Sequence, residues 1–208
     1  MRVALISFHK NISRYPKEWI TKYRNSILNQ TNTRFDIIEL NYGGTYERIF
    51  NESTFIIFDL PDHAQAHNYL LKYCFDDGYD YVLNTNVDDY YPNDRVEIQL
   101  ANFDDKYAVI SGNYAGFRNY DDTACSTKFD AMNIAAEFGK NHNIITHPAC
   151  AYTRTITKYD ECLKSNEIPR DDFCMWKRLL AKGAEFKILN NILLYYRISN
   201  LKTSTNGI

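Results

Sequence analysis

Short apolar runs alternate with longer stretches of helical periodicity along most of the chain. The apolar runs are typical of buried parallel strands and predict strands at 3–7, 35–40, 55–58, 79–84, 107–111, 186–189 and 192–197. Apolar residues that recur three and four positions apart predict helices over 17–29, 62–75, 92–103 and 169–182. Segment 112–143 is less regular, with one short helical pattern over 132–138.

Residues at the element ends support these boundaries. Pro16 suits a first helical turn, Asp62 suits an N-cap, and Gly183 follows the last helix. Strands and helices that alternate in this way indicate βαβ units. We therefore predict an α/β fold with a mostly parallel central sheet and helices on both faces.

Composition favours one soluble domain over residues 1–208. The chain is 45% hydrophobic and 24% charged, with a net charge of -2. These values argue against disorder and give no electrostatic footprint for nucleic acid. The last residues, roughly the final eight, are polar and expected to fray. The apolar run at the N-terminus is too short for a signal peptide or a membrane span, and no C-x-x-C pair occurs. We therefore expect a cytoplasmic protein.

Two adjacent carboxylates, Asp88 and Asp89, follow the buried strand at 79–84. In open parallel sheets, ligands bind outside the carboxyl ends of the strands. Carboxylates suit Mg²⁺ or Mn²⁺, which use one or two of them together with substrate phosphates. The alternative is an ordinary acidic turn that faces solvent.

A second acidic pair, Asp171 and Asp172, opens the predicted helix at 169–182. Acidic residues at a helix N-terminus are favoured by the helix dipole, which is one explanation of the pair. The other is a general base on a rigid element, which takes the proton from an attacking hydroxyl.

Taken together, these motifs resemble the family 2 glycosyltransferases, which have the GT-A fold. The resemblance rests on N-V-D-D at 86–89, D-D-F-C-M-W-K-R-L at 171–179, Y-Y-R at 195–197 and A-H-N at 66–68, in that family's order and spacing. It implies transfer of a sugar, with inversion, from a nucleotide-diphosphate donor to a hydroxyl acceptor. A UDP-sugar is the expected donor; the acceptor is left open among glycan, protein, lipid and modified base.

The resemblance also implies roles for particular residues. Asp88 and Asp89 would bind Mn²⁺ or Mg²⁺, Asp172 would be the catalytic base, and Asp171 would be its neighbour in the site. The chain departs from the family at three places: Asn86 replaces the first Asp of the D-x-D motif, N-Y-G-G at 41–44 replaces an acidic loop, and Ser199 replaces a histidine.

Further residues are candidates by position. The expected donor side comprises Phe8, His9, Asn41, Tyr42, Asn68 and Asn86, and the expected acceptor side comprises His147. A loop histidine that bonds a backbone carbonyl is the alternative for His147. His63 and His67 are spaced four apart as zinc ligands often are, but no adjacent Glu or third ligand accompanies them. We therefore expect that both histidines serve in packing, in helix capping or in a contact with the donor.

Two rival functions remain open. A nucleotidyltransferase would use the same metal chemistry, but its glycine-rich loop after the first strand is missing from S-F-H-K at 7–10. A non-catalytic relative that binds a sugar or a nucleotide is the other rival, for which Asn86 and Ser199 leave room. Motifs of serine hydrolases, P-loop NTPases and Rossmann dehydrogenases are missing from the sequence.

Overall fold

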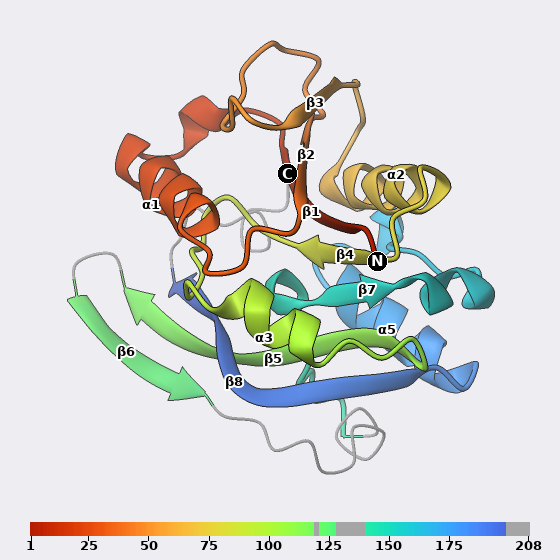
Figure 1. The fold of residues 1–208 in the computed structure, drawn as a ribbon. Helices are drawn as coiled ribbons and strands as arrows, with labels where there is room; N and C mark the ends of the chain where they lie inside the picture. The colour runs from red at the N-terminus through yellow and green to blue at the C-terminus, as the bar shows by residue number, and fades with distance from the viewer. Residues whose placement is uncertain (119–120, 128–139, 199–208) are drawn as a thin grey trace.

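The computed structural model describes residues 1–118, 121–127 and 140–198, in which helices cover both faces of one β-sheet (Figure 1). The strands are β1 (Val3–His9), β2 (Asp36–Asn41), β3 (Thr54–Ile57), β4 (Tyr81–Asn84), β5 (Tyr107–Arg118), β6 (Asp121–Thr127), β7 (Ala151–Thr153) and β8 (Glu185–Ile198). The helices are α1 (Lys17–Leu28), α2 (His63–Asp76), α3 (Arg95–Ala101) and α5 (Asp171–Ala181), with 3-10 turns η1 (Ile12–Arg14), η2 (His147–Ala149), η3 (Arg154–Tyr159) and η4 (Ser165–Glu167).

The sheet has the strand order β3-β2-β1-β4-β7-β5-β6, and β8 also pairs with β5. The pairs β1–β2, β2–β3, β1–β4 and β5–β8 are parallel, whereas β7 and β6 pair antiparallel with their neighbours. The α/β fold and the mostly parallel sheet predicted from the sequence are confirmed. The carboxyl ends of β1, β2 and β4 meet at one edge, where a ligand is expected.

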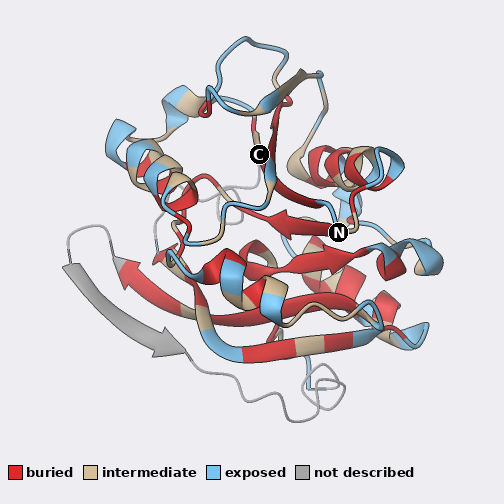
Figure 2. Cartoon of the chain, viewed as in Figure 1, coloured by how far each residue is buried: buried red, intermediate tan, exposed pale blue. Residues whose placement is uncertain are grey.

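Two hydrophobic cores fill the layers on either side of the sheet. Along β1, Ala4 and Ile6 pack into the core under α2 and α5, while Val3 and Leu5 pack into the core under α1 and α3. Side chains of a strand alternate between its faces, so a strand covered on both faces is apolar throughout. Figure 2 shows the buried central strands between helices that expose their outer sides.

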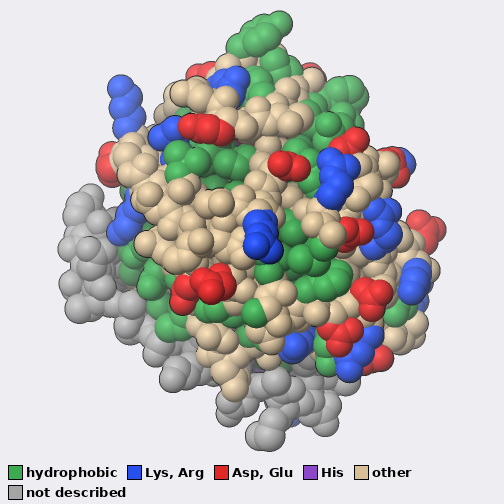
Figure 3. All heavy atoms as spheres, viewed as in Figure 1, with side chains coloured by type: hydrophobic (Ala, Val, Ile, Leu, Met, Phe, Trp, Pro, Cys, Tyr) green, Lys and Arg blue, Asp and Glu red, His purple; other side chains and the backbone are tan. Residues whose placement is uncertain are grey.

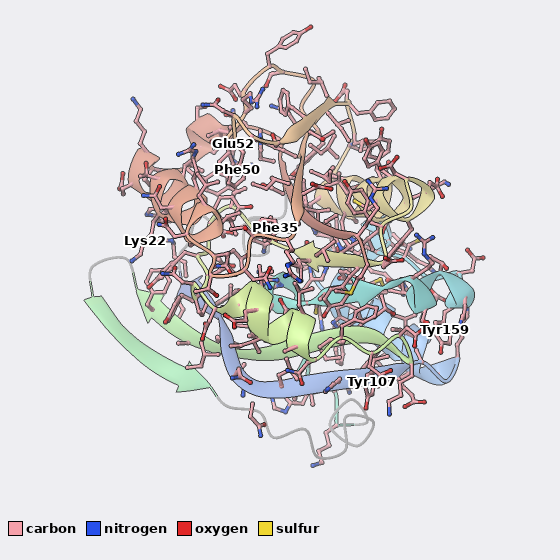
Figure 4. All side chains as sticks on the ribbon, in the orientation of Figure 1. Lys22, Phe35, Phe50, Glu52, Tyr107 and Tyr159 are labelled. Carbon is pink, nitrogen blue, oxygen red and sulfur yellow. The ribbon has the colours of Figure 1, made fainter. Side chains whose placement is uncertain are left out.

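A buried carboxylate of β2 holds the loop between β2 and β3, and this loop packs against α1. Glu39 of β2 is fully buried and accepts hydrogen bonds from the backbone N–H groups of Ile49 and Phe50. The Phe50 ring meets the Tyr23 ring of α1 edge-on, with centroids 5.6 Å apart. Figure 4 labels Phe50 and Glu52 in this loop beside α1. The polar contacts of Glu39 thus offset the cost of burying its charge.

Helix ends follow the local sequence. Asp62 caps α2, because its Oδ1 accepts the N–H of Gln65 at 2.9 Å, as the sequence predicts. After α5, Gly183 has a φ of +84°, a conformation that glycine adopts without strain. The helix predicted over 92–103 is shorter in the structure, where α3 spans Arg95–Ala101.

The second half of the chain differs from the expectation. The strands predicted at 186–189 and 192–197 form one strand, β8, which has a bulge at the exposed residues Asn190 and Asn191. Residues 112–118, expected to be less regular, continue β5 to Arg118, and this end of the strand pairs with β6. Strand β7 has three residues, which is too short for a periodic signal. The helix expected over 132–138 lies outside the described residues.

The surface carries mixed charge. On the face in Figure 3, Lys and Arg side chains are interspersed with Asp and Glu side chains. Within the described part of the chain, no helix combines the length and the apolar character needed to cross a lipid bilayer.

Gly112 tests the packing at the β8 bulge. A Cβ at this position would lie 2.6 Å from Leu193 Cδ1 and 3.0 Å from Asn191 O. We expect Gly112→Ala to lower the free energy of unfolding by about 1–3 kcal/mol, because the overlap forces Leu193 to move. Urea denaturation measures the change. The exposed control Asn190→Ala should stay within about 0.5 kcal/mol of the wild type; equal stability of all three proteins would contradict the packing described.

Candidate active site

A pocket of about 320 Å³ opens at the carboxyl edge of the parallel strands. Its walls come from the ends of β1 and β2, the loop after β4, the segment leading into η2, the start of α5, and β8. Eight of the residues predicted for the catalytic, metal, donor and acceptor roles line it: Phe8, His9, Tyr42, Asn86, Asp88, His147, Asp171 and Asp172. The two acidic clusters, far apart in the chain, therefore face one cleft.

Strand β8 holds the loop that carries Asp88. The backbone carbonyl of Asp88 accepts a hydrogen bond from Arg197 Nε at 2.8 Å, and Asp89 Oδ1 accepts the N–H of Arg197 at 2.8 Å. Tyr90 and Tyr195 form a β-bridge beside these contacts. The Asp88 side chain is 7% exposed and lines the pocket. The Y-Y-R motif at 195–197 thus fixes the position of the first acidic cluster.

The start of α5 carries the second acidic cluster. Asp172 Oδ1 accepts the N–H of Phe173 at 2.7 Å, and Asp172 Oδ2 accepts a bond from Asn143 Nδ2 at 3.3 Å. Burial, with the nearby charge of Asp171, raises the pKa of Asp172 to about 6, against the opposing effect of the Phe173 N–H. A carboxyl with a pKa near the working pH suits general acid–base chemistry.

Asp171 is paired with a histidine from another helix. His63, the first residue of α2, places its Nε2 3.1 Å from Asp171 Oδ2. Burial opposes ionisation of both groups, but their hydrogen bond and mutual attraction hold the pKa of Asp171 below its usual value and raise that of His63. The contact therefore favours the ionised forms of both groups.

His147 and His67 lie behind this pair. Their ring centroids are 4.8 Å apart, and the fully buried His67 also meets Phe8 and Tyr152 edge-on. Burial lowers the pKa of His147 to about 4 and that of His67 well below its usual value, so both rings are neutral. His63 and His67 thus contact different neighbours, His63 at the pocket wall and His67 inside the core.

Some of the donor-side candidates line the pocket, and others do not. Phe8, His9, Tyr42 and Asn86 line the pocket. His9 Nε2 lies 3.0 Å from the buried Glu39 Oε1, which fixes the orientation of the ring. The Phe8 and Tyr42 rings are tilted against each other with centroids 6.4 Å apart. These aromatic residues form the wall at the ends of β1 and β2.

Three candidates lie outside the pocket lining. Asn41 is fully buried, and its side chain bonds Gly43 N, Thr45 Oγ1 and Glu47 O, so it shapes the loop after β2. Asn68 exchanges two hydrogen bonds with the backbone of Leu163, at 2.8 and 3.1 Å. The carboxylate of Asp89 is turned to Arg197. Each of these groups has a backbone partner, which a sequence pattern does not reveal.

Other lining residues were not singled out for the pocket from the sequence: Tyr15, His63, Tyr114, Asn143, Thr146 and Tyr196. Tyr196 belongs to the Y-Y-R motif, and its ring lies 5.4 Å from that of Tyr114. His63 had a signal, its spacing from His67, but its partner Asp171 comes 108 residues later. Tyr15 and Asn143 carry no motif.

The charged side chains that line the pocket are mostly acidic. Among the lining residues that the structure describes, three are carboxylates, Asp88, Asp171 and Asp172, one of which faces His63, and none is Lys or Arg. Within residues 1–118, 121–127 and 140–198, no three His, Cys, Asp or Glu side chains converge as a metal-binding cluster. A cation that binds here would therefore take few protein ligands and complete its coordination with the substrate.

Comparison with known proteins shows similarity in structure. No protein-family model matches the chain, and no curated protein matches its sequence. The solved structure of S. aureus TarS 1–349 in complex with UDP-GlcNAc superposes with a TM-score of 0.71 at 15% identity, over 99% of this chain and 61% of that one. The chain has the GT-A fold.

Two further solved structures share this GT-A fold. S. aureus TarS superposes with a TM-score of 0.68 at 16% identity, over 96% of this chain and 37% of that one. The mannosyltransferase PcManGT from Pyrobaculum calidifontis, in complex with GDP-Man and Mn²⁺, gives 0.64 at 13% identity, over 93% and 56%. The chain thus spans less than two thirds of the length of each of these neighbours.

The burial of Asp172 should lower the stability of the folded protein when this carboxyl is ionised. Folding raises the pKa of the Asp172 carboxyl from about 4 to about 6. Between these pH values the folded protein keeps a proton that the unfolded chain has already released. The free energy of unfolding therefore falls as the pH rises from about 4 to about 6. We expect Asp172→Asn to raise the free energy of unfolding at pH 8 by up to about 3 kcal/mol.

Urea denaturation at pH 8 and pH 4 measures this effect. The gain should shrink toward zero at pH 4, where the wild-type carboxyl is protonated. Asp76→Asn, which changes an exposed carboxylate of α2, is the matched control and should show no such pH dependence. A gain that is equal at both pH values would mean that the Asp172 carboxyl is not destabilised by its site.

Proposed function

We propose that this chain is a divalent-metal-dependent glycosyltransferase that moves a sugar, with inversion, from a UDP-sugar to a hydroxyl acceptor. The observation that carries the proposal is the shared cleft of Asp88 and Asp172 at the carboxyl edge of a GT-A sheet. Structures with this fold include complexes with UDP-GlcNAc and with GDP-Man and Mn²⁺, which supports a nucleotide-sugar donor. The acceptor class, whether glycan, protein, lipid or modified base, is not part of the proposal.

The charge of the pocket supports dependence on a metal ion. A nucleotide diphosphate is an anion. Three carboxylates, of which His63 faces one, would repel it, since the described part of the lining has no Lys or Arg. The Asp88 carboxylate and the Asn86 amide oxygen are hard ligands of the kind that Mg²⁺ and Mn²⁺ accept together with phosphate oxygens. When bound there, such an ion supplies the positive charge that neutralises the leaving diphosphate.

The chain's own residues supply the proton chemistry. Asp172, on a rigid helix start, takes the proton from the acceptor hydroxyl as that oxygen attacks the anomeric carbon. The bond from this carbon to the diphosphate oxygen breaks on the opposite side, which inverts the configuration. The Phe173 N–H and Asn143 amide fix the Asp172 carboxylate in place, and the aromatic wall of Phe8 and Tyr42 is positioned for the nucleotide.

Asp88 tests the metal site. We expect Asp88→Ala to remove Mn²⁺-dependent binding of UDP, because the variant lacks the carboxylate that would bridge metal and protein. Isothermal titration of UDP, with Mn²⁺ and then with EDTA, measures this. The exposed control Asp76→Ala should bind as the wild type does. UDP affinity that is equal in Asp88→Ala and wild type would count against the site.

Asp172 tests the base. We expect Asp172→Asn to slow donor turnover by about 10²–10⁴-fold, because the amide cannot accept a proton, with UDP affinity retained. Hydrolysis or transfer assays over a panel of nucleotide-sugars with Mn²⁺ measure it. Unchanged turnover would place the base elsewhere. Release of pyrophosphate from a nucleoside triphosphate would instead identify a nucleotidyltransferase.

A further inference from the structure

His63 is a pocket residue for which neither the sequence motifs nor the proposed mechanism accounts. It is the first residue of α2, and it lies against the first residue of α5, Asp171, with 3.1 Å between Nε2 and Oδ2. The Asp171 side chain is 7% exposed and that of His63 is 27% exposed. A carboxylate buried to this degree needs a partner, because an unpaired charge in such a place is strongly disfavoured.

Because Asp171 is next to Asp172, its pairing with His63 also matters for Asp172. Asp171 and Asp172 are consecutive, and both line the pocket. Two carboxylates that share a site cannot both ionise easily, so one of them tends to hold a proton at neutral pH. A base must be ionised before it can accept a proton. Something must therefore balance the charge of Asp171 if Asp172 is to act.

The groups that face His63 come from three elements. Asp62 precedes it at the cap of α2, and His67 lies one turn later on the same helix. Asp171 and Asp172 face it from α5, and His147 faces it from η2. His67 and His147 are held neutral by burial. His63, which is more exposed than His67 and directly bonded to Asp171, is the group in this set that carries the positive charge.

We propose that His63 is a positioning residue: as an imidazolium it pairs with Asp171, so that Asp172 is left as the ionised base of the site. The inference rests on the proposed function, because it assigns a purpose to His63 within that reaction. His63 itself does not exchange a proton with the substrate. The contact between His63 and Asp171 also joins α2 to α5. If His63 had only a structural role, this joining of the two helices would be all that it does.

Two substitutions separate charge from packing. His63→Gln keeps an N–H donor for Asp171 but removes the positive charge, whereas His63→Ala removes both. Lys72→Gln is the matched control: it removes one positive charge from the same helix, at an exposed ion pair with Asp76. Melting temperatures of the four proteins show which of them remain folded, and the rate comparison uses those that do.

The first readout is the dependence of donor turnover on pH. In the wild type the rate should rise with pH through a value near 6, as the Asp172 carboxyl ionises. In His63→Gln the charge of Asp171 is no longer balanced, and an unbalanced carboxylate in the same site raises the pKa of its neighbour Asp172, by roughly one unit or more. In His63→Gln the rise should therefore move up by roughly one pH unit, with about a fivefold loss at pH 6 and recovery toward the wild-type rate above pH 8. A profile that superposes on that of Lys72→Gln would overturn the proposal.

The second readout needs no substrate, so it stands even if the proposed reaction is wrong. NMR titration of ¹³C,¹⁵N-histidine-labelled protein follows each imidazole, with His63 assigned from the His63→Gln spectrum. His63 should titrate above the ordinary value of about 6.5, and in Asp171→Asn its pKa should fall by one unit or more. A His63 that titrates at the ordinary value and does not respond to Asp171→Asn would show that the pair carries no charge, and the inference would fail.

Discussion

Crowding of like charge is the constraint on which the rest of this site depends. Three carboxylates face one pocket, and no Lys or Arg occurs among the lining residues for which the structure gives positions. Such an arrangement is stable only if each negative charge is paired, protonated or left for a ligand to neutralise. The three carboxylates differ in their surroundings: Asp171 is paired with His63, Asp172 has a pKa raised to about 6, and Asp88 lines the pocket from the loop that Arg197 contacts. The proposed function would give these three aspartates different chemical roles.

The fold creates this crowding by bringing strand ends and a helix start to the same edge. Asp88 follows β4 in the middle of the sheet, and the contacts of Arg197 hold its loop against β8. Asp171 and Asp172 start α5, which covers the face of the sheet that α2 also covers. The N-terminus of a helix favours negative charge, so the same position that suits a base also limits the cost of placing it there.

Much of this arrangement could be predicted from the sequence, because strong local patterns carry it. Apolar runs located β1, β2 and β4, and the order of the acidic motifs indicated the GT-A fold. Contacts between distant segments could not be predicted in the same way. Asn41, Asn68 and Asp89 have the polar side chains of a binding site, but backbone groups of Gly43, Leu163 and Arg197 engage them. The polar residues Asn190 and Asn191 predict a break between two strands rather than a bulge in one, because Gly112, which faces the bulge, is far away in the chain.

The most direct test is a crystal structure of the protein with UDP and Mn²⁺, in which anomalous scattering locates the metal. The account predicts one manganese ion that is coordinated by an Asp88 oxygen and by both phosphates, with the Asp172 carboxylate facing the same cleft from the start of α5. A manganese ion bound elsewhere, or a UDP molecule that occupies the pocket without metal and without contact to the Asp88 loop, would contradict it.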